Sequence, residues 1–182
     1  MSIWIKLILM NKMQQVKLEK ITLNVGVGAP GERLENAKVL LERLSGKKAV
    51  LTQAKDRNPT FKLRKGDNIG AKVTLRGKAA IELVKKALDV KDNALPDSSF
   101  DKFGNIAFGV KEYIDFPGMK YDPKIGMMGF DISISLTKAG KRISLRRIQK
   151  KRLPKKQRVT PIEAKEFMKN QFNIRIEVPQ EE

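Results

Sequence analysis

Strict alternation of apolar and polar residues between Ile69 and Arg76 is the feature that most narrows the folds open to this chain. The apolar members are Ile69, Ala71, Val73 and Leu75, and the others are Gly70, Lys72, Thr74 and Arg76. Period two over this length predicts a β-strand with one buried face. The opposite face carries two cations and a hydroxyl in a row, which suits contact with a line of phosphates.

A basic segment precedes this strand and has neither strand nor helix periodicity. Its cations are Lys55, Arg57, Lys62, Arg64 and Lys65, and between them stand Asn58, Pro59, Thr60 and Phe61. We expect a loop that projects from the rest of the fold and contacts a polyanion. The plainer alternative is a charged loop that contacts only solvent, because loops are commonly polar.

Further strands and helices follow from the same reasoning. Strands are expected at residues 20–27, 49–54 and 130–137, and another follows a turn at 103–105 and continues through Ile114, although Glu112 breaks its pattern. Amphipathic helices are expected at 32–44 and 78–88. A third begins with the capping box at Thr160 and Glu163 and continues to about Phe172. Residues 93–99 and 116–129 are expected to be loops.

These elements predict an α+β fold in which helices cover the apolar face of a sheet and leave its polar face open. The residues expected on that open face are Thr22, Asn24, Lys72, Thr74 and Arg76. Residues 17–182 are expected to form one domain and residues 1–16 an N-terminal extension, with Met1, Met10 and Met13 all possible native starts. The apolar run at residues 3–10 is too short to span a bilayer and lacks the features of a signal peptide.

Charge narrows the partner to a polyanion. The 182 residues carry a formal net charge of +18, and residues 138–158 alone hold eleven Lys or Arg and no acid. Nucleic acid is favoured over an anionic membrane, since no long basic amphipathic helix is present. Residues 138–158 are expected to be a basic arm that orders on RNA, with a flexible solubilising segment as the alternative. Its candidate RNA contacts are Lys141, Arg142, Arg146 and Arg147.

Missing residue types exclude several functions. The chain has no Cys and no His, which removes disulfides, zinc fingers and Ser-His or Cys-His catalysis. The glycine-rich turn at residues 26–32 lacks the Lys-Ser/Thr ending of a nucleotide-binding loop, so a tight turn explains it better. Aromatic residues make up only 6% of the chain, which favours structured RNA over stacked single strands. No catalytic residue, metal site or cofactor is expected.

Three ordered motifs carry a resemblance to a known family. The segments KITLNVGVG, AKDRNPTFKLRKGDNIGAKVTLRG and FGNIAFGVKEYIDFPGMKYDPKIGMMGFDISI resemble large-subunit ribosomal protein family number five, over roughly residues 17–137. The basic stretch from Lys138 and the helix after it resemble the archaeal and eukaryotic branch. Bacterial relatives have Gly-Gln-Lys-Pro where this chain has Gly46-Lys47-Lys48-Ala49, so an RNA contact of that glutamine is not carried over.

The resemblance implies a structural constituent of the cytoplasmic large ribosomal subunit, with an antiparallel sheet whose open face binds 5S rRNA and adjacent large-subunit rRNA in the central protuberance. Asn24 and Thr74 stand at matching contact positions. The loop at residues 55–65 would approach transfer RNA in the peptidyl site (P-site tRNA). An intersubunit bridge to a protein of the small-subunit head would involve Phe100, Asp101, Lys102, Phe103, Gly104 and Asn105. Neighbouring proteins of the central protuberance would be further partners, and no small-molecule substrate and no membrane is expected.

Two other classes of function stay open from the residues alone. One is an RNA-modifying or phosphoryl-transfer enzyme that uses Lys or carboxylates, although no carboxylate cluster or nucleophile-base pair is visible in the sequence. The other is a protein-interaction module that acts outside the ribosome.

Overall fold

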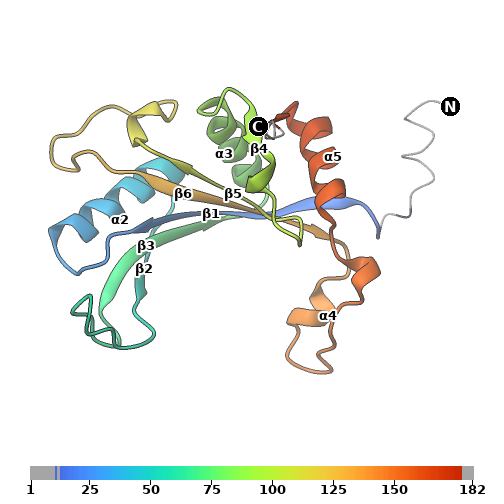
Figure 1. Ribbon diagram of the computed structural model, residues 1–182, viewed down its shortest axis with the longest axis horizontal. Helices are drawn as coiled ribbons and strands as arrows, with labels where there is room; N and C mark the ends of the chain where they lie inside the picture. The colour runs from blue at the N-terminus through green and yellow to red at the C-terminus, as the bar shows by residue number, and fades with distance from the viewer. Residues whose placement is uncertain (1–10, 12, 178–182) are drawn as a thin grey trace, which may run out of the picture.

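Five strands form one antiparallel sheet, as Figure 1 shows. The computed structural model describes residue 11 and residues 13–177. The strands are β1 (Val16–Gly26), β2 (Val50–Gln53), β3 (Asn68–Leu75), β5 (Ile106–Val110) and β6 (Phe130–Lys138). Their order in the sheet is β2-β3-β1-β6-β5, so the longest strand, β1, lies at the centre.

Helices cover one face of this sheet (Figure 1). They are α2 (Glu32–Ser45), α3 (Lys78–Asp89) and α5 (Pro161–Phe172), while the short α4 (Arg142–Leu145) lies apart in the basic arm. The expected capping box begins α5: Thr160 Oγ1 accepts a hydrogen bond from the backbone N–H of Glu163, and Glu163 accepts one from the N–H of Thr160. The expected α+β fold, with helices on one side of the sheet, is confirmed.

The core lies between the sheet and these helices. Ile21 and Leu23 of β1 are completely buried beside Ile132 and Ile134 of β6, and helix residues such as Leu40, Leu41, Val84 and Met168 cover them. Complete burial of a side chain of this size contributes about 1.5–3 kcal/mol. The alternation of β1 is therefore fixed energetically, and its polar residues must face the other way.

The strand expected to continue through Ile114 was wrong. β5 ends at Val110, and Glu112 is exposed beyond it. A 3-10 helix at Tyr113–Asp115 then turns the chain and buries Tyr113 completely. The Tyr113 hydroxyl accepts a hydrogen bond from the backbone N–H of Asp122 at 2.9 Å, so it has a polar partner inside the core.

Two short strands were missed. β4 (Ala94–Pro96) and β7 (Arg175–Glu177) pair in parallel and form a separate two-stranded sheet. β4 lies in a segment expected to be a loop, and 3-10 helices at Asp97–Ser99 and Lys155–Gln157 were not expected either. Three residues are too few for a period-two pattern to show. In the part of the chain that the structure describes, no helix is long and apolar enough to cross a membrane.

The N-terminal extension and the candidate native starts lie mostly outside the described residues. Residues 1–10 and 12 belong to that part of the chain, and so do residues 178–182. Met1 and Met10 are among them. The single domain assigned to residues 17–182 stays a prediction.

Candidate nucleic-acid interface

Strand register brings the expected open-face residues together. On β1, Thr22 pairs with Thr74 of β3, and Asn24 pairs with Lys72. Residues that are directly paired in a sheet point to the same face. The β1 residue between them, Leu23, is buried toward the helices, so these four polar side chains lie on the opposite, uncovered face.

The same face carries further polar groups that widen the surface. Ser133 and Asp131 of β6 pair with Thr22 and Asn24, and Thr52 of β2 pairs with Gly70. Gly70 leaves room for this packing, because a Cβ there would lie 2.8 Å from Thr52 Oγ1 and 2.7 Å from the Val25 carbonyl oxygen. Thr52 was missed by sequence reasoning, since β2 is too short to reveal which way it faces.

Arg76 extends this row beyond the end of β3. Its side chain is 63% exposed, and its Nη1 lies 3.8 Å from Oε1 of Glu19 on β1. All five residues expected on the open face therefore share it. We define the open face as the uncovered side of the five-stranded sheet.

The basic loop between β2 and β3 is a tight hairpin. Asn58 and Leu63 exchange two backbone hydrogen bonds of 3.0 Å, and the N–H of Lys62 donates to the Pro59 carbonyl across the turn. At the base, the N–H of Ala54 donates to the Asp67 carbonyl at 2.8 Å. Phe61 is strongly exposed at the tip. The hairpin turns its cations outward around a hollow of about 520 Å³ lined by Arg57, Pro59, Lys62, Leu63 and Arg64.

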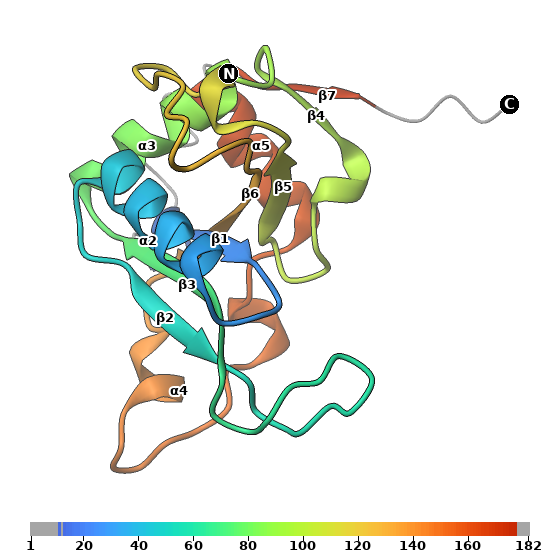
Figure 2. The same ribbon diagram turned by 90° about the vertical axis from the view of Figure 1, so that its left-hand side faces the viewer.

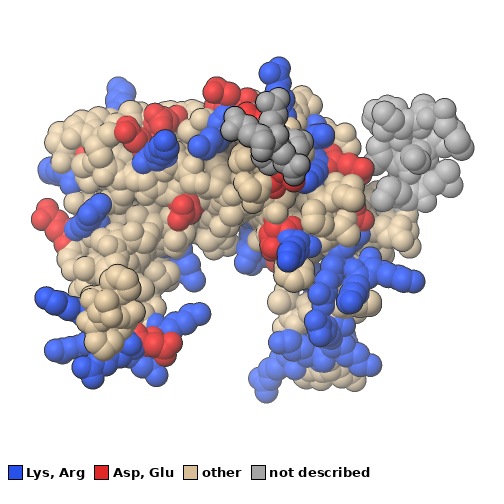
Figure 3. All heavy atoms as spheres, viewed as in Figure 1, with Lys and Arg blue, Asp and Glu red and all other residues tan. Residues whose placement is uncertain are grey.

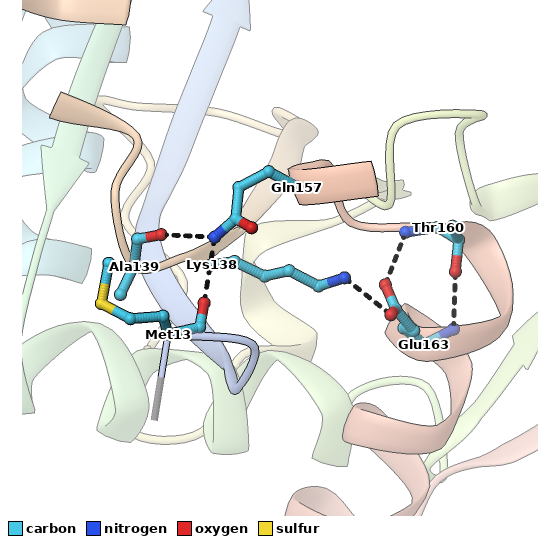
Figure 4. Close-up of polar contacts among 6 residues, drawn as sticks. All are labelled: Met13, Lys138, Ala139, Gln157, Thr160 and Glu163. Atoms are coloured by element: carbon cyan, nitrogen blue, oxygen red, sulfur yellow. Dashed lines mark hydrogen bonds and ion pairs between the residues drawn. The ribbon is translucent and has the colours of Figure 1, made fainter. Parts of the chain in front are cut away.

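The basic arm is a folded loop whose two ends meet. Gln157 Nε2 donates hydrogen bonds to the carbonyl oxygens of Ala139 at 2.8 Å and Met13 at 3.1 Å, as Figure 4 shows. Within the arm, the N–H of Lys151 donates to the Ile143 carbonyl. Exposed apolar residues lie between its cations, among them Leu145 and Ile148.

The hairpin and the arm project from the same side of the sheet. Figures 1 and 2 both show the loop between β2 and β3 and the segment around α4 on the side opposite α2 and α3. Lys and Arg cover both projections, and the space-filling view leaves a hollow between them (Figure 3). The open face therefore lies between two cationic projections. We call the open face and these two projections together the cationic arch. Sequence alone predicted three basic regions but not that they share one side.

Lys138 is an exception among the cations of the expected arm. Its side chain is only 6% exposed, and its Nζ donates to Glu163 Oε1 at 2.6 Å (Figure 4). Burial raises the pKa of Glu163, but the hydrogen bonds from Lys138 and from the Thr160 backbone outweigh it and hold that pKa below its ordinary value. Lys138 thus joins β6 to α5 and is not available to a polyanion.

The four arm residues expected to contact RNA lie at or near α4. Lys141 directly precedes the helix and also pairs with Glu19, Arg142 begins the helix, and Arg146 and Arg147 follow it. Arg146 Nε donates to the Gln149 carbonyl at 3.0 Å, while Arg147 is exposed.

The segment at residues 100–105 forms a compact turn beside α5. The N–H of Asp101 donates to the Asn105 carbonyl, and that of Gly104 to the Asp101 carbonyl. Gly104 has φ +73°, and a Cβ there would lie 2.6 Å from a methyl of Val159, so only glycine fits. Lys102 and Phe103 are exposed, and Arg158 lies 6.0 Å above the Phe103 ring, while Lys165 lies 5.7 Å above Phe100.

This geometry suits a structured polyanion. Hydroxyls, an amide and cations on the open face can bind phosphate and sugar groups, and the projections add charge on both sides. Among residues 13–177 and residue 11, no three Asp, Glu, His or Cys side chains gather as a metal site would require.

Comparisons with known proteins agree with this geometry. Residues 11–64 match the family described as Ribosomal protein L5, and residues 68–173 match the C-terminal part of the same ribosomal family. A large ribosomal subunit protein uL5 from Methanosphaera stadtmanae is 47% identical over 92% of this chain and 100% of that protein. Proteins of the same name from Sulfurisphaera tokodaii and Sulfolobus acidocaldarius are 47% and 45% identical, over 91% of this chain and 94% and 93% of their own lengths.

The family resemblance inferred from the three motifs is confirmed, and the alternative of an RNA-modifying or phosphoryl-transfer enzyme falls away with it. The matches together extend through both the strands of the open face and the basic arm. The chain belongs to the ribosomal protein L5 family, whose members are structural proteins of the large ribosomal subunit and not enzymes.

Proposed function

We propose that this protein binds 5S rRNA and adjacent large-subunit rRNA through the open face and the basic arm. As a family member it is a constituent of the large ribosomal subunit in the cytoplasm. The observation that carries the proposal is the gathering of Thr22, Asn24, Lys72 and Thr74 on one uncovered face between two cationic projections. The polar groups on the strands give specificity for this RNA, while the cations of the two projections add affinity.

The central contact is assigned to Asn24 and Thr74. They lie diagonally across adjacent strands, because Thr74 pairs with Thr22, two residues before Asn24, so a single sugar-phosphate unit can reach both. Asn24 is partly buried and pairs with Lys72 of β3 on one side and with Asp131 of β6 on the other. A side chain flanked on both sides has less conformational entropy to lose when it binds than a fully exposed one.

Replacing both Asn24 and Thr74 by Ala should weaken binding to 5S rRNA at least tenfold, because each lost hydrogen bond to RNA costs about 1 kcal/mol or more. A filter-binding titration at fixed salt measures this. The matched control replaces Asn170 and Gln171, exposed amides in the last turn of α5, by Ala. Equal affinities of the two double variants would move the 5S rRNA site away from the open face.

We assign the hairpin at residues 55–65 to P-site tRNA. Its ends are held by the backbone bonds of Ala54, while its tip at Pro59 and Lys62 projects beyond the sheet. The tip can thus contact a second polyanion without any change in the core. Sequence-independent phosphate contact fits this role, because every tRNA passes through the same site.

We assign residues 100–105 to an intersubunit bridge with a protein of the small-subunit head. Phe103 supports this assignment, since the residue is 56% exposed although Arg158 lies over one side of its ring. Aromatic residues and Arg are enriched at protein interfaces.

Replacing Phe103 by Ala should weaken association of the two subunits roughly threefold or more, because the ring would lose a buried contact. Light scattering of mixed subunits across a magnesium titration measures this association. The control is Phe61→Ala, which removes another strongly exposed ring from the hairpin tip. If Phe61→Ala weakens association as much as Phe103→Ala, the bridge is not specific to residues 100–105.

A further inference from the structure

A β-bulge in β1 places an acidic side chain on the cationic open face. The pairing of β1 with β6 shifts between Leu18 and Lys20: Leu18 pairs with Leu136, but Lys20 pairs with Ser135. Leu18 packs against the core and Ile21 is completely buried. Two residues therefore stand between inward positions, so Glu19 and Lys20 both face outward. Bulges commonly redirect a side chain in this way.

Glu19 has two cationic partners that belong to different parts of the interface. One carboxylate oxygen pairs with Lys141 Nζ at the base of the arm, and the other lies 3.8 Å from Nη1 of Arg76 beyond β3. The Glu19 side chain is only 14% exposed, whereas those of Lys141 and Arg76 are 36% and 63% exposed. The carboxylate is thus enclosed, and the cations around it remain open to a ligand.

An acid in this position opposes RNA binding if charge alone matters. It cancels part of the positive potential that attracts phosphates. Its contacts, however, restrict two long side chains that would otherwise lose rotamer freedom when they bind. They also join the arm to the sheet, so that Lys141 and Arg76 keep a fixed spacing.

We infer that Glu19 is a positioning residue of the RNA interface, which holds Lys141 and Arg76 in place to bind phosphates of a folded RNA. This inference rests on the proposed function. It adds a selective element: Glu19 lowers affinity for RNA in general and raises the preference for one folded shape. The negative charge of Glu19 weakens the general attraction between the protein and RNA phosphates. Its ion pairs, in contrast, hold two cations ready for one particular RNA shape.

The test compares affinities for a 5S rRNA transcript and for an unrelated RNA hairpin in Glu19→Gln. Glutamine keeps the size and a hydrogen-bond acceptor but removes the charge. We expect affinity for the unrelated RNA hairpin to rise roughly twofold. The preference for 5S rRNA over that RNA should fall about fivefold. A thermal melt of each variant reports whether the fold is intact.

The matched control is Glu82→Gln, the same substitution at an exposed acid of α3 on the helical side of the sheet. Among the described residues Glu82 makes no ion pair of 4 Å or less. It removes the same charge away from the RNA interface, so the ratio of the two affinities should stay unchanged. If Glu19→Gln raises both affinities by the same factor and also leaves their ratio unchanged, Glu19 is only a repulsive charge and the inference is overturned.

A second comparison separates positioning from an indirect effect on the fold. In a chain with Lys141→Met and Arg76→Met, Glu19→Gln should no longer change the ratio, because the groups it positions are gone. A fivefold fall in that background would overturn the inference. If the unaltered chain shows no preference for 5S rRNA, the proposed function fails first, and this result is distinct from either outcome above.

Discussion

Replacing Glu163 by Gln is expected to destabilise the fold by about 2–3 kcal/mol, the largest effect of a single substitution that we predict. Gln keeps the reciprocal hydrogen bonds of the capping box with Thr160. What it removes is the negative charge beside Lys138, whose ammonium is almost completely buried. The expected loss lies at the lower edge for a broken buried pair because Glu163 itself is 37% exposed.

Lys138→Met provides the informative contrast. Methionine fills a similar volume without a charge, and replacing a buried cation by an apolar residue is often close to neutral. We expect a change of less than about 1 kcal/mol in urea unfolding for Lys138→Met and for the control Glu166→Gln, an exposed acid on the same helix as Glu163. Equal losses for Lys138→Met and Glu163→Gln would mean that the pair contributes net stability instead of merely compensating a buried charge.

Acid dependence of stability checks the same pair. The folded protein holds the pKa of Glu163 below its ordinary value, so the unfolded chain binds the proton more readily. The stabilisation is therefore present above the ordinary pKa of a glutamate and is lost as pH falls through the lower pKa of Glu163 in the folded protein. Unfolding of the unaltered protein should show this loss, and Glu163→Gln should show less of it.

The strand pattern of the sequence predicts the buried position of Lys138, but the high charge of the residues that follow it suggested otherwise. The alternation Phe130, Ile132, Ile134, Leu136 continues with Lys138 as the next inward residue. Its neighbours in sequence are so basic that we assigned it to the arm. The stronger physical signal was the strand period, because one buried face fixes the direction of every side chain along it.

The bulge at Glu19 is also visible in the sequence, as a change of phase in the apolar pattern of β1. Val16 and Leu18 alternate with each other, and Ile21, Leu23 and Val25 alternate one residue out of phase. That phase change is the expected sign of one extra residue in a strand. The strand expected from residue 20 omitted the first half of the pattern, and so the acidic side chain of the open face was missed.

The sequence pattern could not predict how segments that are far apart in the chain are arranged relative to one another. Periodicity predicted β1, β3 and β6 and which side chains of each point outward, but it does not give strand order. Only with the order β2-β3-β1-β6-β5 do the hairpin and the arm flank the open face on one side. The contact residues were thus predictable as separate rows, whereas the arch was not.

The arm and the hairpin offer the second large effect, because the arch lets one be removed without the other. Replacing residues 142–155 by a short Gly-Ser linker removes seven cations and keeps Lys141 beside Glu19. The bond from Gln157 to Ala139 brings the two ends together. Affinity for 5S rRNA at low salt should fall about a hundredfold, and the slope of log affinity against log salt should become shallower by roughly two to four units. The preference of the protein for 5S rRNA over an unrelated RNA stem-loop should persist in large part, since the open face is intact.

The control for the loss of charge is Lys85→Gln with Lys86→Gln, two exposed cations of α3 on the helical side. It should change the salt slope by less than about one unit, because those groups lie away from the arch. A lost preference with an unchanged slope would contradict the assignment of the arm to phosphate contact.

Replacing the hairpin at residues 57–65 by a Gly-Ser linker should give the opposite result. The bonds between Ala54, Gly66 and Asp67 that close its base remain, so β2 and β3 keep their register. Large subunits carrying this variant should retain 5S rRNA but release P-site tRNA roughly threefold to tenfold faster, because the cations of the tip are gone. Loss of 5S rRNA from these subunits would instead assign both projections to one RNA held within the arch, and tRNA contact would then have to come from elsewhere on the protein.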